Sequence, residues 1–212
     1  MTAGEALAEG IAALGLDLDH APQTKLLAYL TLLEKWNRTH NLTSIHGVLR
    51  MVSHHLLDSL AVLPHLPHRA GLRLIDVGSG GGLPGIPLAI ARPAWQVVLL
   101  DSSQKKCAFL RQAAAELKLS NAEVVNSRAE SFESARPFDV VIARAFSSLA
   151  EVAANATHLL ARGARLVAMK GNYPKAEIAA LPSHVAVVAV HLLEIPGVEG
   201  QRHLVIMEMQ RA

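Results

Sequence analysis

A glycine-rich segment, DVGSGGGLPG at residues 76–85, holds the residues best suited to binding a cofactor. It follows an apolar run at 72–77 (LRLIDV), so the chain is expected to turn sharply at the end of a strand. Glycine permits such a turn and lets the backbone approach a ligand where any Cβ would collide. We therefore expect Gly78, Gly80 and Gly82 to border a cofactor. A tight turn without a ligand is the alternative.

A carboxylate follows at the end of the next apolar run. Asp101 closes the run 96–101 (QVVLLD), about 20 residues after the loop. A carboxylate at this place accepts hydrogen bonds from ribose hydroxyls, in sites for NAD and in sites for S-adenosylmethionine. Asp101 is therefore a second candidate for cofactor binding.

The spacing of the glycines favours one of these cofactors. The dinucleotide pattern G-x-G-x-x-G meets Leu83 at its sixth position, or has to include Pro84. The methyltransferase pattern, in which Asp76 is followed by glycine at every second residue, fits without gaps. An acid entering the loop suits a sulfonium and an ammonium and would repel a pyrophosphate. The segment favours S-adenosylmethionine, and an NAD-dependent oxidoreductase is kept as an alternative.

The elements around these residues predict an α/β fold. Strands are expected at 72–77, 96–101, 122–126, 138–143 and 164–170, with helices at 85–91, 103–118 and 147–161 between them. This alternation is typical of a parallel sheet. Runs at 184–195 and 202–209 predict a final hairpin whose last strand is antiparallel. A seven-stranded, mostly parallel sheet is the layout of Rossmann-like class I methyltransferases.

Helical periodicity at 5–16, 23–36 and 46–63 predicts a helical N-terminal extension, residues 1–65, before the methyltransferase domain, residues 66–212. Both parts are expected to form one compact unit. Residues 20–75 hold six of the Lys and Arg side chains and seven of the eleven histidines, with only Glu34 and Asp58 as acids. A phosphate-rich partner suits this region, and a solvated helical surface is the alternative.

Composition bounds the location of the protein. Cys107 is the only cysteine, which excludes an intrachain disulfide and favours a reducing cytoplasm. A small buried side chain is the expected role of Cys107. No apolar run approaches the roughly 18–20 residues that span a bilayer, and the N-terminus lacks the layout of a signal peptide. A cytoplasmic protein without a membrane partner is expected.

Eight segments, in order, resemble the RsmG (GidB) methyltransferases. They are NLTSI at 41–45, HHLLDSL at 54–60, DVGSGGGLPGIPLAI at 76–90, LLDSSQKKCAFLRQ at 99–112, NSRAESF at 126–132, VIARAFSSL at 141–149, LVAMKGNYP at 166–174 and QRHLVIM at 201–207. That family transfers a methyl group from S-adenosylmethionine to N7 of the guanine at position 527 of 16S ribosomal RNA. The resemblance implies a partner, 16S rRNA or the small ribosomal subunit, and a monomer is expected. It implies cofactor contacts at Gly78, Leu83, Ala129, Glu130 and Arg144.

Motifs of other base methylases are missing after the fourth strand. Residues 143–146 read ARAF, where amino-group methylases carry Asn/Asp-Pro-Pro-aromatic, and no cysteine nucleophile lies there. Of the Lys-Asp-Lys-Glu set of ribose methylases, only Lys170 has a match. Guanine N7 has a free lone pair at neutral pH, so its methylation requires alignment and no general base. No catalytic base is therefore assigned, and Arg144 is the nearest candidate for a catalytic role.

Basic and polar residues near the substrate side are candidates for RNA contacts: Lys170, Arg202 and His203 at strand ends, and Arg38 and Asn41 in the extension. Surface charges or helix caps are their alternative roles, and Asn41 to Ser44 could cap the third helix. His54 and Asp58, four residues apart, are expected to be a structural pair, so no metal site is predicted. A methyltransferase of another RNA or of a small molecule, and a non-catalytic RNA-binding factor, are the further alternatives.

Overall fold

The computed structural model describes residues 1–144 and 148–210 and is built around one seven-stranded sheet. The strand order is β3-β2-β1-β4-β5-β7-β6. Of the seven strands described, β7 alone runs opposite to the others, so the predicted class, a mostly parallel α/β sheet with one late reversed strand, is confirmed. The strands are β1 (Arg73–Val77), β2 (Gln96–Asp101), β3 (Ala122–Asn126), β4 (Phe138–Arg144), β5 (Leu160–Lys170), β6 (Val185–Leu192) and β7 (His203–Met209).

Alternate residues of the central strands face two hydrophobic layers, as the period of two in a strand requires. In β1, Leu74 packs into the layer that holds the N-terminal helices, α5 and α6, whereas Ile75 packs into the layer that holds α7. Both faces of the strands are buried, which explains why their sequences read as continuous apolar runs.

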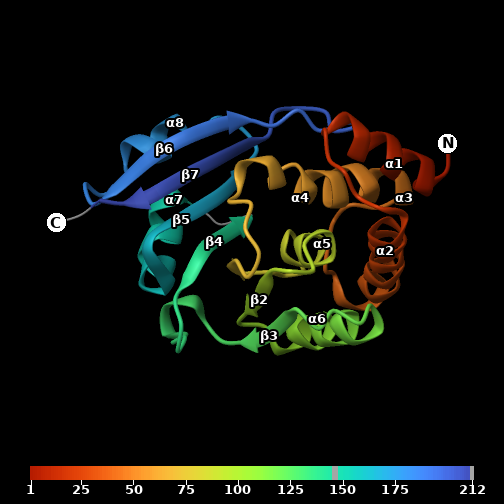
Figure 1. Cartoon of the computed structure of the whole chain (residues 1–212), viewed down its shortest axis with the longest axis horizontal. Helices are drawn as coiled ribbons and strands as arrows, with labels where there is room; N and C mark the ends of the chain where they lie inside the picture. The colour runs from red at the N-terminus through yellow and green to blue at the C-terminus, as the bar shows by residue number, and fades with distance from the viewer. Residues whose placement is uncertain (145–147, 211–212) are drawn as a thin grey trace.

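Helices cover both faces and gather most densely toward the N-terminus, away from β6 and the C-terminus (Figure 1). The α-helices are α1 (Ala3–Ala13), α2 (His20–His40), α3 (Val48–Met51), α4 (Asp58–Leu60), α5 (Gly85–Ala91), α6 (Gln104–Glu116), α7 (Leu149–Ala156) and α8 (Lys175–Ala179). Short helical turns are the π-helix η1 (Val52–Leu57) and the 3-10 helices η2 (Leu63–His65), η3 (Ala129–Ser131) and η4 (Thr157–Leu159).

The third predicted helix differs from the expectation. In place of one helix over 46–63, α3 leads into the π-helical turn η1 and then α4, with η2 at Pro64. Residues 41–44 do not cap it: Asn41 ends α2 in the left-handed conformation, and Gly47 precedes α3. A π-helical turn changes which side chains share a face and is frequent at functional sites. It is invisible to a search for a period of 3.6 residues.

The predicted helix at 147–161 is also too long. Residue 147 lies outside the described residues, α7 ends at Ala156, and Leu160 already belongs to β5. The cause is pairing, because Leu160 lies opposite Phe138 at the start of β4. The register shifts before the next pair, Val140 with Arg165, and β5 begins earlier than the expected residue 164.

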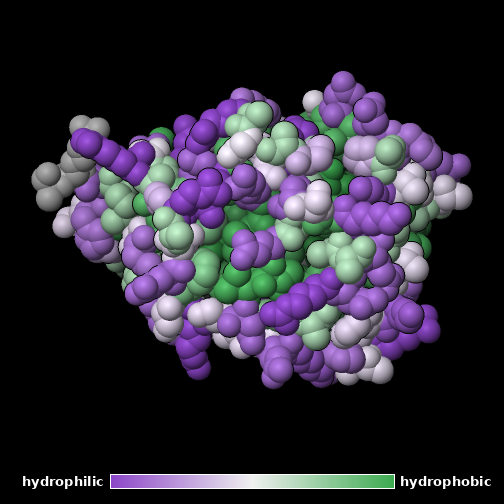
Figure 2. Space-filling model, turned by 60° about the horizontal axis from the view of Figure 1, so that its bottom comes forward, coloured by the Kyte–Doolittle hydropathy of each residue, from purple (hydrophilic) through white to green (hydrophobic). Residues whose placement is uncertain are grey.

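The N-terminal helices share the core of the sheet. Leu7 of α1 and Leu30 of α2 belong to one hydrophobic cluster with Leu99 of β2 and Phe109 of α6. No helix among the described residues is long and apolar enough to cross a membrane. Figure 2 shows one face of the molecule, on which hydrophilic side chains surround a hollow with a hydrophobic floor.

Candidate functional site

The glycine loop adopts backbone angles that explain its spacing. Gly78, Gly80 and Gly82 have φ values of 72°, 58° and 87°, in the region that residues with a side chain rarely adopt. At Gly82 space is lacking as well, since an added Cβ would lie 2.5 Å from Ile86 Cδ1. The requirement for glycine at every second position therefore comes from the backbone of the loop itself.

Asp76 lies buried beneath the loop, whereas its place in the sequence predicts an acid that faces the cofactor. Its side chain is fully buried, and Oδ2 accepts a hydrogen bond from Gly85 N at the start of α5 (2.9 Å). Ser79 Oγ donates to the Asp76 carbonyl (2.8 Å). The Asp76 carboxyl thus links the end of β1 to the start of α5. Asp76 is not among the described residues that line the adjoining cavity.

Stability should depend on pH through Asp76. Burial raises the pKa of this carboxyl to about 7, against the opposing effect of its hydrogen bond from Gly85. The folded protein therefore binds a proton that the unfolded chain releases near pH 4. Stability from this group is present below pH 4 and is lost as the pH rises through 7. Relative to Asp76→Asn, which stays neutral, the wild type should lose on the order of 4 kcal/mol between pH 4 and pH 8. Urea unfolding at several pH values measures this difference, and parallel curves for the two proteins would contradict it.

The N-terminal extension holds the loop from outside. Tyr29 of α2 is fully buried, and its hydroxyl donates a short hydrogen bond of 2.5 Å to the Gly81 carbonyl. Desolvation raises the pKa of this phenol far above its ordinary value, so the hydroxyl keeps its proton. An added Cβ at Gly81 would lie 3.2 Å from Leu33 Cδ1, which shows how closely α2 packs on the loop.

Replacing Tyr29 by phenylalanine should leave the Gly81 carbonyl buried and without a donor. We expect a loss of about 1–2 kcal/mol in unfolding free energy and weaker cofactor binding, because the loop loses its outer support. Thermal unfolding and cofactor titration measure the two effects. Phenylalanine at Trp36, a half-buried neighbour on α2 without a bond to the loop, is the control. Unchanged cofactor affinity in Tyr29→Phe would show that the hydrogen bond does not position the loop.

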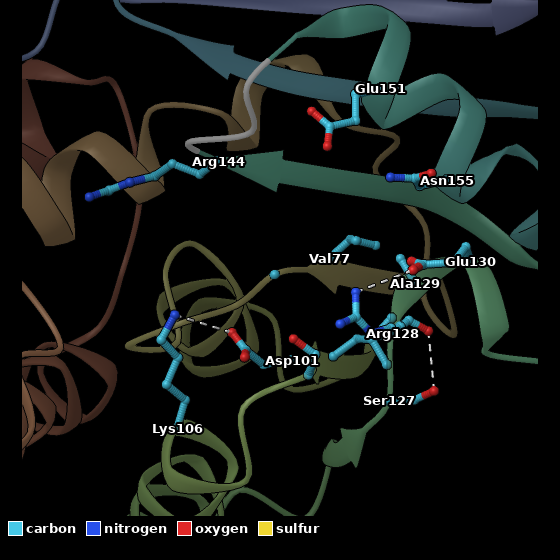
Figure 3. A pocket seen from close by; sticks show the side chains of 13 residues that line it. Val77, Asp101, Lys106, Ser127, Arg128, Ala129, Glu130, Arg144, Glu151 and Asn155 are labelled. Atoms are coloured by element: carbon cyan, nitrogen blue, oxygen red, sulfur yellow. Dashed lines mark hydrogen bonds and ion pairs between the residues drawn. The ribbon is translucent and has the colours of Figure 1, made fainter.

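A cavity of about 540 Å³ opens at the carboxyl ends of the parallel strands, where ligands bind in such sheets. We call it the loop pocket. Figure 3 shows Glu151 and Asn155 of α7 on one side and Asp101 and Lys106 on the other. Its lining comprises Val77, Gly78, Leu100, Asp101, Ser102, Lys106, Ser127, Arg128, Ala129, Glu130, Arg144, Glu151 and Asn155.

The loop pocket brings together five of the eight residues predicted to contact a cofactor, which are Gly78, Asp101, Ala129, Glu130 and Arg144. The other three do not line it. Gly80 bonds to Asp101, Gly82 packs on Ile86, and Leu83 is buried in the layer of α5 and α6. These three residues shape the loop, since Gly80 and Gly82 have a positive φ and Leu83 packs in the core.

Sequence reasoning missed the contribution of α7 to this pocket. Glu151 and Asn155 are four residues apart, so they lie on one face of the helix. Two polar residues four positions apart, on a helix after the fourth strand, are the signal in the sequence that could have identified them. Lys106 was the other omission, and its Nζ lies 3.9 Å from Asp101 Oδ2. Ser102, Ser127 and Arg128 adjoin predicted residues in the sequence.

Backbone donors fix the carboxylate of Asp101. Gly80 N donates to Oδ2 (2.9 Å), and Ser103 N donates to Oδ1 (2.8 Å). The side chain is buried at 6% exposure, yet it lines the loop pocket. Each carboxylate oxygen can accept a further hydrogen bond. The loop thereby orients an acceptor pair toward the cavity.

Arg144, at the end of β4, lies between the loop pocket and a second cavity. Its side chain points away from the residues of the loop pocket (Figure 3). Its Nη1 donates to Asp58 Oδ2 (2.8 Å) and to the His54 carbonyl (3.3 Å). The second cavity, of about 330 Å³, we call the basic pocket. It is lined by Ile45, His54, Asp58, Arg144, Met169, Lys170, Gly171 and Arg202.

Asp58 is the buried acid of the basic pocket. It is 4% exposed and also lies 3.4 Å, through Oδ1, from Arg202 Nε. Burial raises the pKa of this carboxyl, and the charges of Arg144 and Arg202 oppose that rise. The ion pairs of Asp58 are with these two arginines, and the charge of His54, four residues earlier, also acts to lower the pKa of Asp58.

His55 is a buried, uncharged side chain next to Arg144. It is 1% exposed, with Nδ1 3.1 Å from the His54 carbonyl and Nε2 2.9 Å from Thr43 Oγ1. Burial, together with the charge of Arg144, lowers its pKa to about 4. The ring is therefore uncharged at neutral pH and takes no proton from a substrate.

The residues predicted to contact RNA have different surroundings. Lys170 and Arg202 line the basic pocket, where the Lys170 side chain is 12% exposed and forms an ion pair with Glu177 (2.7 Å). His203 is buried, and its Nδ1 lies 2.9 Å from the Gly171 carbonyl. It therefore presents little surface to a ligand, because β7 places its ring under the loop after β5. Arg38 and Asn41 are exposed near the end of α2, outside the basic pocket.

No group of three or more His, Cys, Asp or Glu side chains within residues 1–144 and 148–210 could hold a metal ion. Cys107 is buried, with Sγ donating to the Asp101 carbonyl (3.3 Å), as its expected small-side-chain role requires. Residues 145 and 146 of the ARAF sequence lie outside the described residues.

Solved structures are similar in fold. TrmN from Thermus thermophilus matches with a TM-score of 0.56 at 22% identity, over 82% of this chain and 53% of that one. The ribosomal protein L11 methylase from Lactobacillus delbrueckii matches with a TM-score of 0.58 at 14% identity, over 74% and 79%. These likenesses show a Rossmann-like methyltransferase fold.

Sequence relatives define the family. A ribosomal RNA small subunit methyltransferase G of Nitrosospira multiformis is 52% identical over 95% of each chain. The protein with that name in Chromobacterium violaceum is 53% identical, over 96% of this chain and 97% of its own. The family model described as rRNA small subunit methyltransferase G matches residues 22–205. The resemblance of the eight segments is thus confirmed, and the chain belongs to the rRNA small subunit methyltransferase G family.

Proposed function

We propose that this chain transfers a methyl group from S-adenosylmethionine to N7 of a guanine in 16S ribosomal RNA, at position 527. One observation carries the proposal beyond family membership. Arg144 lines both the loop pocket and the basic pocket, so a site for a cofactor adjoins a site for an acceptor base. Methyl transfer needs this adjacency, because the two reacting atoms have to come together in line.

The loop pocket fits S-adenosylmethionine better than NAD. A pyrophosphate binds the free N–H groups at the first turn of the helix after the glycine loop. Here Gly85 N already donates to the Asp76 carboxyl, so that position is taken by an acid. Asp101 is left as the acceptor for ribose hydroxyls, with Ala129 and Glu130 beside it for the adenine. Gly78 and Arg144 would lie toward the methionine part.

S-adenosylmethionine supplies a methyl group on a sulfonium, and the guanine N7 lone pair forms the new bond while the carbon–sulfur bond breaks. No proton leaves N7. The chain therefore has to bind, align and exclude water. In the basic pocket, Lys170 and Arg202 offer donors for the acceptor O6 and for phosphate oxygens. Arg38, the other basic residues of 20–75 and the amide of Asn41 would bind the RNA backbone further out.

The two parts of the chain would have different roles within one compact unit. Residues 1–65 would support the glycine loop through Tyr29 and supply part of the RNA surface, whereas residues 66–212 would carry the cofactor. A monomeric, cytoplasmic enzyme acting on rRNA or on the small subunit is what we expect.

The test has two parts. Calorimetric titration should show binding of S-adenosylmethionine and none of NAD. Incubation with labelled S-adenosylmethionine and small subunits that lack the modification should then label 16S rRNA. Binding of NAD alone would identify an oxidoreductase, and cofactor binding without transfer to any RNA would indicate a small-molecule methyltransferase or an RNA-binding factor.

A further inference from the structure

An exposed aromatic side chain stands beside the basic pocket and has no part in the proposed reaction. Tyr173 lies in the short loop between β5 and α8, two residues after Gly171, which lines the pocket. It is 53% exposed. Among the large hydrophobic side chains that the structure describes as exposed, Tyr173 is the aromatic one; the others are Met1, Val48, Leu49, Val188 and Leu192.

A buried histidine packs against the Tyr173 ring. His203 of β7 packs against it edge to face, with ring centroids 5.6 Å apart and an interplanar angle of 82°. The His203 ring is itself fixed, since its Nδ1 lies 2.9 Å from the Gly171 carbonyl. The tyrosine ring thus has a fixed neighbour, while 53% of the residue stays exposed.

Ion pairs and hydrogen bonds also hold both ends of the loop between β5 and α8. Before it, Lys170 forms an ion pair with Glu177 of α8 (2.7 Å), and Glu177 also accepts a hydrogen bond from Leu149 N (2.8 Å). After it, Lys175 N donates to the Tyr173 carbonyl (3.0 Å). A ring presented by such a loop loses little conformational freedom when a ligand covers it.

We infer that Tyr173 is a stacking platform for an unpaired nucleobase of the RNA, next to the guanine that enters the basic pocket. This inference rests on the proposed function. Unstacked bases in RNA loops bind exposed aromatic rings, whose flat apolar faces match them without regard to base identity. Lys170 and Arg202, on the pocket wall beside the same loop, would bind the phosphates that flank this base.

The inference also assigns a role to His203. This residue was expected to touch RNA, but only 6% of it is exposed. Its contacts are with Gly171 and Tyr173, so it positions the platform and does not bind the ligand itself.

Kinetics with unmodified small subunits provide the first test. Tyr173→Ala should raise the KM for the subunit roughly 10- to 100-fold, the range for loss of one base–aromatic stack. The affinity for S-adenosylmethionine and kcat should stay as in the wild type. Tyr173→Phe and Tyr173→Trp should restore the KM, because each keeps a flat ring. The slope of binding affinity against salt concentration should not change, since no phosphate contact is lost.

Val188→Ala is the matched control. It truncates a hydrophobic side chain of nearly equal exposure, 52%, in the middle of β6, and should leave the KM unchanged. A KM for Tyr173→Ala within twofold of the wild type, or no rescue by tryptophan, would overturn the inference.

Photo-crosslinking identifies what covers the ring. Tyr173→p-benzoylphenylalanine, irradiated on unmodified subunits, should crosslink to a 16S rRNA nucleotide close to the methylated guanine. A crosslink to a ribosomal protein only, or none, would overturn the stacking platform. Failure of the proposed function is a separate outcome, because the wild-type enzyme would then label no RNA at all.

Discussion

Replacement of Asp101 by alanine is expected to weaken the binding of S-adenosylmethionine about 100-fold, or about 3 kcal/mol. Two effects add. The ribose hydroxyls lose a charged acceptor, and the backbone donors Gly80 N and Ser103 N lose theirs. The second effect loosens the glycine loop, whose conformation depends on the bond from Gly80.

Isothermal titration calorimetry measures the loss in affinity. Asp101→Asn keeps one acceptor oxygen and should fall between alanine and the wild type. Asp139→Asn, at the start of β4 and at the opposite end of the sheet, makes the same chemical change outside the loop pocket and should bind normally. An affinity of Asp101→Ala within threefold of the wild type would show that this carboxylate does not hold the cofactor.

Replacement of Arg144 by methionine is expected to reduce methyl transfer at least 100-fold and to lower the free energy of unfolding by about 3 kcal/mol. The stability loss follows from Asp58, which is 4% exposed and bonded to Arg144 at 2.8 Å. Removing one partner leaves a buried charge whose remaining partner, Arg202, lies at 3.4 Å. The loss of activity follows from the position of Arg144 between the two pockets.

A double variant separates the two effects. Arg144→Met combined with Asp58→Asn removes the unpaired charge, so most of the stability should return, whereas single-turnover methyl transfer should stay low. Urea unfolding and rapid-quench assays measure these quantities. Recovery of transfer together with stability would mean that Arg144 serves only to neutralise Asp58.

The consequences of both substitutions depend on the same arrangement. Asp101 belongs to the wall of the loop pocket that faces α7, and Arg144 separates that pocket from the basic one. If the first variant loses cofactor binding, and the second loses more methyl transfer than its change in cofactor affinity explains, the pockets have the separate roles that we propose.

Local patterns predicted most of the fold. Helix α5 and strands β2 and β3 have the expected bounds, because each is a short apolar run ended by glycine, proline or polar residues. The requirement for Gly78, Gly80 and Gly82 was visible in the sequence, since a positive φ demands glycine whatever surrounds it. Asp101 was predictable for a similar reason: its place at the end of a strand determines its direction.

Features that depend on contacts distant in sequence were not predictable. The bond from Tyr29 to Gly81 joins residues 52 positions apart, and that from Arg144 to Asp58 joins residues 86 apart. The burial of His203 depends on the pairing of β7 with β5. Asp76 was expected beside the cofactor, but its position beneath the loop follows from its bond with α5. In each case the residue is visible in the sequence, but its role depends on contacts that form only when the sheet and helices pack together.

The central claim is methylation of one guanine by this chain, and mapping that guanine tests it most directly. Assembled small subunits are purified from a strain that lacks the gene and are incubated with the purified protein and S-adenosylmethionine. Reduction and strand cleavage at N7-methylguanine should then show one new cleavage, at position 527, which Arg144→Met does not produce. Cleavage at another site, or a pattern identical to that of the untreated subunits, would contradict the account.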